Sequence, residues 1–170
     1  MKPTIIIAGF PGVGKSTYAK IYKDSIDLES SNFHWIETPA GKFQHPEWPM
    51  NYVNAIRILE ENLNGNQVKY IFISTHKEVL DILLSYCVPF IVAYPTNKKE
   101  TLKKFRDRGN SKEFIKKIDE SWTEYIDNLK TCGMPAIKVT GSNHLSYYLT
   151  GDSNYLQACC MLYPESEVDG

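Results

Sequence analysis

Short apolar runs alternate along the chain with segments in which apolar residues recur every three or four positions. The runs predict strands at residues 4–8, 25–28, 68–74, 89–94 and 136–139. The first run holds three consecutive isoleucines, which is typical of a parallel strand covered on both faces. The helical spacing predicts helices at about 16–23, 49–63, 75–84, 98–106, 111–129 and 145–149.

Local signals refine this pattern. Thr75 with Glu78, and Asn110 with Glu113, fit capping boxes at two helix starts. Residues 32–48 are rich in proline and aromatic residues and are expected to be irregular. Strands that alternate with helices predict an α/β fold of three layers, in which helices cover both faces of a five-stranded parallel sheet.

The composition is that of a globular protein. The 170 residues are 42% hydrophobic and 23% charged, with a formal net charge of -1. This balance disfavours a generic nucleic-acid coat or a polybasic membrane protein, and no apolar run is long enough to span a bilayer. The four cysteines form no C-x-x-C pair, so neither a zinc site nor a thioredoxin-like motif is indicated. We expect a reduced, cytoplasmic compartment. We expect one domain at residues 1–150 and an acidic tail at 151–170.

Residues 9–17 read Gly-Phe-Pro-Gly-Val-Gly-Lys-Ser-Thr and match the phosphate-binding pattern G-x-x-x-x-G-K-[ST] completely. Glycines allow such a loop to turn its backbone N–H groups inward around phosphate oxygens. The helix that follows directs the positive end of its dipole at the same anion. The motif therefore predicts binding of ATP with Mg²⁺. Lys15 would hold the β- and γ-phosphates and Ser16 would ligate Mg²⁺; the predicted nucleotide contacts are Gly9, Gly12, Val13, Gly14, Lys15, Ser16 and Thr17.

Two carboxylates follow the second predicted strand, at an edge where doubly wound sheets bind ligands. Asp27 and Glu29 alternate onto the same side of an extended segment. Asp27 is a candidate general base for a hydroxyl acceptor or a ligand of a magnesium-bound water, and Glu29 is a candidate acceptor contact. The alternative is a pair of solvated loop carboxylates.

The third predicted strand ends in Ser74-Thr75-His76-Lys77. Many P-loop enzymes have an aspartate here that holds the magnesium shell, and Ser74 could instead bond a metal-bound water. Lys77 is a candidate contact to the acceptor.

Arg106 and Arg108 flank an aspartate at the end of a basic helix and precede Gly109. Two guanidinium groups near a glycine suit a clamp on a transferring phosphoryl group, and the segment 105–112 could close as a short lid. The alternative is a solvated basic face.

The aromatic residues between 32 and 48 could wall an acceptor pocket, because aromatic faces stack well on bases. Trp35 is the candidate contact among them. The alternative is that these rings pack the segment onto the core.

These motifs together resemble the small P-loop kinases of the nucleoside monophosphate kinase type, and are similar to the adenylate-kinase-like proteins of bacteriophages and large viruses. The resemblance covers about residues 1–150. It is carried by the loop at 9–17, Asp-Leu-Glu-Ser-Ser at 27–31, Ile-Ser-Thr-His-Lys at 73–77, Tyr-Pro at 94–95 and Phe-Arg-Asp-Arg-Gly-Asn-Ser at 105–111.

The resemblance implies a P-loop NTPase-type fold and transfer of the γ-phosphate of Mg-ATP to a small acceptor. Arg106 and Arg108 would be lid arginines, residues 32–64 the acceptor-binding insertion, and Arg57 a contact to the acceptor phosphate.

Three hypotheses follow. The first is a nucleoside or deoxynucleoside monophosphate kinase. The second is a kinase for a hydroxyl acceptor, such as a polynucleotide 5′ end or a small metabolite, with Asp27 or Glu29 as base; only this one involves nucleic acid. The third is a nucleotide-binding regulator with little turnover. No pattern specifies the acceptor, its base or the oligomeric state.

Overall fold

A computed structural model describes residues 4–63, 67–141 and 143–149. It has an α/β architecture in which five parallel strands form one sheet, in the order β2-β5-β1-β6-β7, accompanied by helices. The predicted α/β class and the five-stranded parallel sheet are confirmed, and the arrangement is consistent with a three-layer α/β fold. The chain divides into two compact units, which are described in turn.

The first unit comprises residues up to 9 and residues 15–90. Its strands β1 (Ile5–Gly9) and β2 (Ser25–Asp27) both pair in parallel with β5 (Tyr70–Ile73). In this register Ala8 lies opposite Ile73 and Asp27 lies opposite Phe72. Because the three strands are parallel, their carboxyl ends lie at the same edge of the sheet.

Four helices belong to this unit: α1 (Lys15–Ile21), α2 (Ser31–His34), α3 (Met50–Leu63) and α4 (Lys77–Ser85). Half or more of the apolar positions at helical spacing in the two longer helices are buried, because α3 packs against α4 and β5. The fully buried side chains include Tyr52, Val53 and Ile56 from α3 and Val79 and Leu83 from α4.

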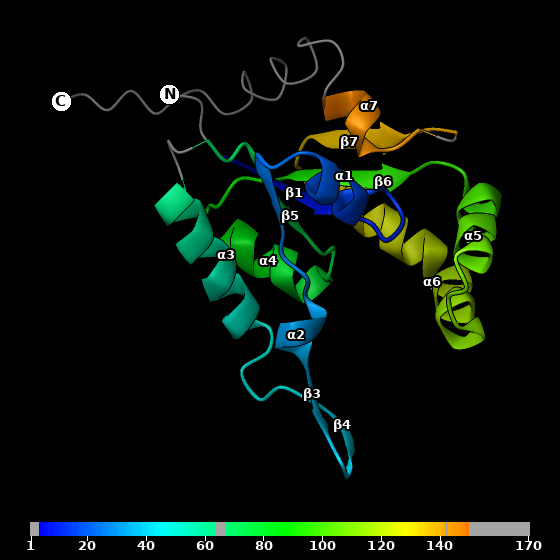
Figure 1. Ribbon diagram of the computed structural model, residues 1–170, viewed down its shortest axis with the longest axis horizontal. Coiled ribbons are helices and arrows are strands. Elements are labelled where there is room, and N and C mark those ends of the chain that lie inside the picture. The colour runs from blue at the N-terminus through cyan, green and yellow to red at the C-terminus, as the bar shows by residue number, and fades with distance from the viewer. Residues whose placement is uncertain (1–3, 64–66, 142, 150–170) are drawn as a thin grey trace. The chain divides into compact units, whose positions relative to one another are not determined.

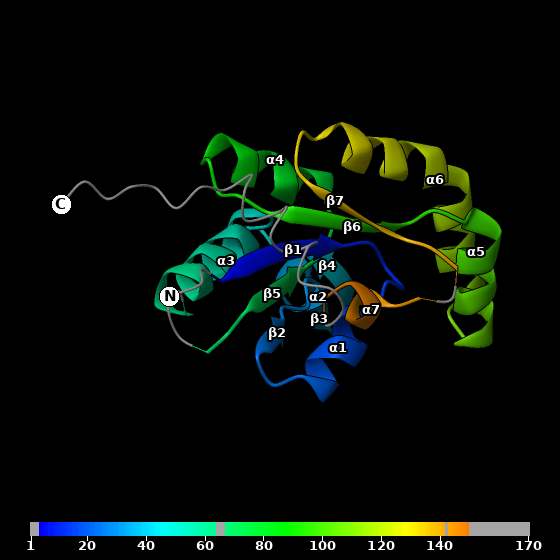
Figure 2. The ribbon, with the colours of Figure 1, turned by 90° about the horizontal axis from the view of Figure 1, so that it is seen from above.

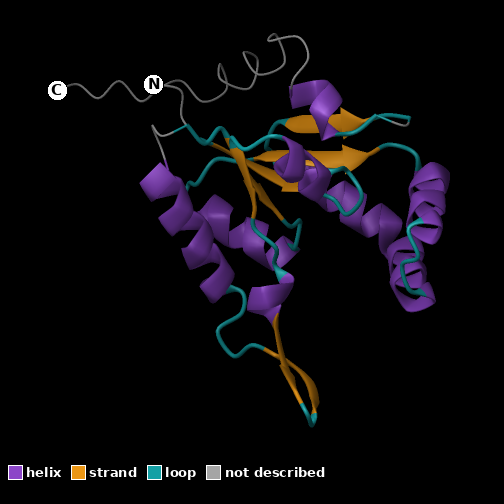
Figure 3. Cartoon of the chain, viewed as in Figure 1, coloured by secondary structure: helices purple, strands orange, loops and turns teal. Residues whose placement is uncertain are grey.

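Residues 35–44 form a hairpin of β3 (Trp35–Thr38) and β4 (Gly41–Gln44), so the prediction of an irregular segment is wrong there. Figure 1 shows the hairpin extending beyond α2, and Figure 3 shows its two strands apart from the main sheet. All eight strand residues are exposed. Without a buried face the hairpin needs no apolar alternation, and the sequence therefore carries no strand signal.

The second unit comprises residues 10–14 and residues from 91 onward. Its strands β6 (Ile91–Pro95) and β7 (Ala136–Val139) pair in parallel. Helix α6 (Lys112–Thr131) packs against β6 and against α5 (Lys98–Asp107), as Figure 2 shows, and α7 (Leu145–Leu149) follows β7. The ranges predicted for β7 and α7 are confirmed in full.

Both predicted capping boxes are wrong. Ser111, not Asn110, is the N-cap of α6, and its hydroxyl accepts a hydrogen bond from Phe114 N. His76 occupies the N-cap position of α4 without a side-chain cap. The carboxylate of Glu78 instead accepts a hydrogen bond from Trp48 Nε1.

Two predictions concern the membrane and the tail. Among the described residues, no helix is both long and apolar enough to cross a membrane. The predicted tail at 151–170 lies outside the described residues.

Candidate functional site

The backbone of the predicted phosphate-binding loop has the conformation that glycine permits. Gly12 and Gly14 have φ values of 85° and 101°, in the left-handed region that other residues avoid. A Cβ atom at Gly12 would also lie 2.8 Å from Phe105 Cε1. Both the turn and the close approach of α5 thus require glycine at position 12.

Two backbone hydrogen bonds hold the same loop segment in the second unit. Phe10 N donates to Ala93 O of β6, and Leu145 N of α7 donates to Val13 O. His144 lies against Gly14, since its Cβ would be 3.2 Å from a Cβ built there. His144 was not identified from the sequence, because no local motif connects it to the loop.

Lys15 follows the loop and begins α1 in the first unit. Its Nζ donates to Gly9 O at 2.6 Å and to Ile73 O at 3.5 Å, at the carboxyl ends of β1 and β5. Burial lowers the pKa of Lys15, while the charges of Asp27 and Glu29 act in the opposite direction. The ammonium group is therefore held away from water and within the electrostatic reach of two carboxylates.

Ser16 and Thr17 follow in the first turn of α1, where both are exposed. No hydrogen bond from a described residue engages the Ser16 hydroxyl. Within the described part of the chain, no group of three or more His, Cys, Asp or Glu side chains is placed to hold a metal ion. Mg²⁺ usually binds through few protein ligands together with substrate phosphates, and the Ser16 hydroxyl fits that kind of site.

The Tyr52 hydroxyl joins the ends of β2 and β5. It donates to Leu28 O at 2.7 Å and accepts from Ser74 N at 3.1 Å, and the side chain is fully buried. Asp27 is half-buried directly before Leu28. Burial raises the pKa of Asp27; Lys15 opposes this shift and Glu29 adds to it. The sequence placed Tyr52 only in an apolar stripe, and nothing local reveals the role of its hydroxyl.

Aromatic rings gather beside these strand ends. The His34 ring stacks between Trp35 and Trp48, with centroid distances of 4.2 and 4.1 Å. The His76 ring stands edge-on to His34 and Trp48, and its Nδ1 is hydrogen-bonded to Ser74 Oγ at 2.8 Å. The segment predicted as an acceptor wall thus lies next to the end of β5.

Lys77 and Arg57 have other partners in the structure. Lys77 Nζ forms an ion pair with Asp81 at 2.6 Å on the surface of α4. The Arg57 guanidinium lies 4.7 Å from the centre of the Tyr86 ring, at the C-terminal end of α4. Their predicted role as acceptor contacts stays a prediction.

The remaining acceptor candidates are near the surface. Glu29 is exposed and accepts a hydrogen bond from Ser31 N at 3.3 Å. Trp35 is part of the ring stack, and Lys42 Nζ lies 4.9 Å from the centre of its ring.

The predicted lid arginines lie at the end of α5 in the second unit. Arg106 and Arg108 are both exposed, and Arg108 is the C-cap of the helix. Arg108 Nη1 lies 3.8 Å from a Cβ built at Gly12, so one of the two guanidinium groups is beside the loop. Gly109 follows with a φ of 78°, as expected where the chain turns after a helix.

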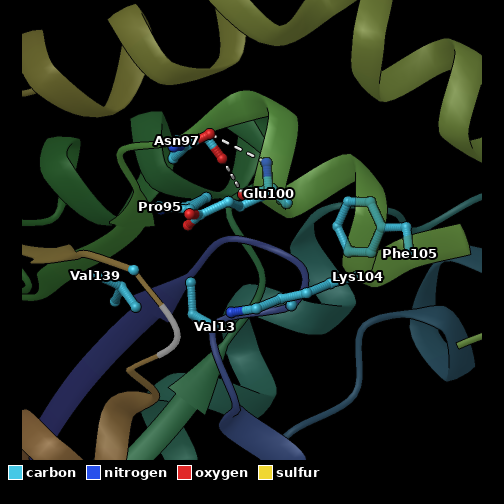
Figure 4. Close-up of a pocket in the computed structure, with 10 residues that line it drawn as sticks. Val13, Pro95, Asn97, Glu100, Lys104, Phe105 and Val139 are labelled. Atoms are coloured by element: carbon cyan, nitrogen blue, oxygen red, sulfur yellow. Dashed lines mark hydrogen bonds between the residues drawn. The ribbon is translucent and has the colours of Figure 1, made fainter. Parts of the chain in front are cut away.

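A pocket of the second unit opens beside the same loop (Figure 4). The Lys104 side chain extends toward Val13, and Asn97 caps α5 by accepting from Glu100 N. The pocket is lined by the loop, by the ends of β6 and β7 and by α5. The lining residues include Gly12, Val13, Pro95, Glu100, Lys104 and Val139. The polar residues of this pocket were not identified from the sequence, because they share no motif.

The chain matches no protein-family model and no curated protein. Four features of the described residues are relevant to chemistry. They comprise a glycine-dependent loop, a desolvated ammonium group, an exposed serine hydroxyl and a half-buried carboxylate.

Proposed function

We propose that this protein is an ATP-dependent phosphotransferase of the P-loop kinase type, which transfers the γ-phosphate of Mg-ATP to a small acceptor. The observation that carries the proposal is the position of Lys15. Within a complete G-x-x-x-x-G-K-[ST] motif, its ammonium group donates to carbonyl oxygens at the ends of β1 and β5. No carboxylate of a described residue forms an ion pair with it, and a half-buried cation in that position is suited to an anionic ligand.

The residues have distinct tasks in this proposal. The loop N–H groups and Lys15 bind the phosphates, and the Ser16 hydroxyl ligates Mg²⁺, which neutralises developing charge when bound. The exposed guanidinium groups of Arg106 and Arg108 are available to stabilise the transferred phosphoryl group. Catalysis of this kind depends mostly on positioning and charge.

The resemblance to nucleoside monophosphate kinases supports phosphoryl transfer and implies a nucleotide acceptor. The positions of Asp27 and Glu29 beside Lys15 favour a second candidate, a kinase for a hydroxyl acceptor. The two candidates share the ATP site and differ only in the acceptor.

The test is binding and consumption of Mg-ATP by the wild-type protein and two variants. Lys15→Ala removes the proposed phosphate contact, and Lys20→Ala is the matched control, because Lys20 is an exposed lysine of the same helix. At an ATP concentration of about 100 times the Kd, binding should stabilise the fold by about 2.7 kcal/mol. We expect this stabilisation in the wild type and in Lys20→Ala, and not in Lys15→Ala.

Three outcomes are distinguishable. Equal behaviour of Lys15→Ala and the wild type would refute the ATP site. Binding without phosphoryl transfer to any acceptor would indicate a nucleotide-binding regulator. ATP-dependent labelling of an acceptor, lost in Lys15→Ala, would establish the kinase.

A further inference from the structure

We propose that the phosphoryl acceptor is a neutral molecule that presents a hydroxyl group, and that Asp27 accepts the proton of that hydroxyl. The inference rests on the proposed phosphotransferase function and names its substrate class.

The fold holds Asp27 firmly at the end of β2. Its backbone is in register with Phe72 of β5, and the next residue donates its N–H to Phe72 O at 2.9 Å. The Tyr52 hydroxyl is hydrogen-bonded to the carbonyl oxygen of Leu28, the residue after Asp27, and to the N–H of Ser74. The backbone hydrogen bonds thus hold the Cα atom of Asp27 in place beside the end of β5.

The carboxylate itself remains available. Asp27 is half-buried, and no described residue donates a hydrogen bond to its side chain or forms an ion pair with it. Its charge nevertheless acts on Lys15, whose Nζ reaches Gly9 O and Ile73 O. A carboxylate placed near the phosphate-binding cation but not paired with it can accept a proton.

The charge around this edge disfavours a phosphate monoester as acceptor. Asp27 and Glu29 would both repel its dianion. The cations predicted to bind it have other partners, since Lys77 pairs with Asp81 and Arg57 lies over Tyr86. A neutral acceptor does not meet this repulsion.

The neighbouring surface is polar and aromatic. The Ser74 hydroxyl and the His76 ring are hydrogen-bonded to each other, and the His76 ring is nearly perpendicular to the rings of His34 and Trp48. Hydroxyl and imidazole groups are suited to a sugar or nucleoside, which combines hydroxyl groups with an apolar face.

The proposed transfer forms one bond and breaks another. The acceptor oxygen forms a bond to the γ-phosphorus of Mg-ATP, and the bond from that phosphorus to the β,γ-bridging oxygen breaks. The electron pair leaves with Mg-ADP, and the hydroxyl proton passes to the Asp27 carboxylate and then to solvent. The product is a phosphate ester, whereas a monophosphate acceptor would give a phosphoanhydride.

The bond type of the product gives the test. The full chain is incubated with Mg-ATP and a candidate acceptor from one of two sets, called pools below, and the product is identified by ³¹P NMR. One set contains nucleosides and hexoses, each supplied separately so that the source of the hydroxyl is identified. The other set contains nucleoside monophosphates. A 5′-hydroxyl oligonucleotide is tested on its own, because it is a polyanion, and ester formation from it alone would overturn the neutral acceptor. We expect ester formation from the first pool, which Lys15→Ala abolishes.

Two variants test the role of Asp27. Asp27→Asn should lower kcat by about 100-fold or more, the usual contribution of a general base, with the Kd for Mg-ATP changed by less than about threefold. Asp127→Asn is the matched control, because Asp127 is an exposed residue of α6. The nucleotide Kd also shows that Asp27→Asn is folded.

The outcomes separate the two proposals. An anhydride product from the monophosphate pool would overturn the inference and leave the phosphotransferase function intact. Equal kcat in Asp27→Asn and Asp127→Asn would overturn the role of Asp27. Transfer to neither pool would overturn the inference, and retained Lys15-dependent ATP binding would then show that the nucleotide site alone survives.

Discussion

The Tyr52→Phe substitution removes one oxygen atom from the centre of the first unit. That oxygen donates to Leu28 O and accepts from Ser74 N, and the side chain is 0% exposed. Phenylalanine retains the ring and its contacts with Phe33 and Trp48. The substitution therefore isolates the two hydrogen bonds between the ends of β2 and β5.

The expected cost follows from what remains unpaired. An unsatisfied buried backbone group costs about 1–3 kcal/mol, and the substitution leaves a carbonyl and an N–H without this partner. Partial relaxation brings the expected loss to about 2–4 kcal/mol, a large share of the usual ~5–15 kcal/mol of a domain. With a urea m-value of about 2 kcal/mol/M, the midpoint should fall by about 1–2 M.

Urea unfolding followed by circular dichroism measures this loss. Tyr86→Phe is the matched control, because Tyr86 is 48% exposed and no described residue hydrogen-bonds its hydroxyl. The control should lie within about 0.5 kcal/mol of the wild type. If Tyr52→Phe is as stable as Tyr86→Phe, the Tyr52 hydroxyl does not hold the strand ends together.

Three further predictions concern the loop and its charges. Gly12→Ala should cost about 1–2 kcal/mol for the left-handed backbone and more for the clash with Phe105, whereas Gly133→Ala, at a φ of 84° with open space around it, should show the backbone part alone in urea unfolding. Burial raises the pKa of Asp27 above its ordinary 3.8, so between the unfolded and folded pKa values the folded chain binds more protons and its stability falls as pH rises. In thermal unfolding, the melting temperature of Asp27→Asn relative to the wild type should therefore rise from acid to neutral pH. A melting-temperature difference that does not change with pH would contradict this. Burial lowers the pKa of Lys15 below 10.5, so between the folded and unfolded pKa values the unfolded chain binds more protons and stability rises with pH. Without nucleotide at pH 7, Lys15→Met should therefore melt at a higher temperature than the wild type. A lower melting temperature would count against desolvation of the Lys15 ammonium group.

Local patterns were sufficient to predict most of the fold. Residues 136–139 and 145–149 form the predicted strand and helix because their apolar spacing matches their burial. The hairpin at 35–44 escaped prediction because both of its faces are exposed. Sequence periodicity reports burial, and it is silent where an element has no buried face.

The capping errors have a different cause. The pattern at Asn110 also accommodates Ser111, whose hydroxyl caps the N–H three residues on, and only the backbone decides between them. At α4 the carboxylate of Glu78 bonds Trp48, 30 positions earlier in the chain. A local motif loses here to a tertiary contact that no short window contains.

The same division applies to the candidate site. Residues 9–17 and the carboxylates at 27 and 29 could be identified because their chemistry depends on neighbours in the sequence. Tyr52 and His144 could not, because the first joins two strand ends and the second lies on a glycine 130 positions away. Their roles arise from packing and became visible only in the structure.

The charges near Lys15 connect the two proposals. Burial disfavours the charged forms of both Lys15 and Asp27, so each is held in an unfavourable environment in the folded protein. A phosphate bound at Lys15 would favour the ammonium form and would further disfavour the Asp27 carboxylate. Phosphate binding would therefore increase the tendency of Asp27 to take up a proton at the moment when a hydroxyl acceptor must release one. A monophosphate acceptor has no proton to give, and the same arrangement would only repel it.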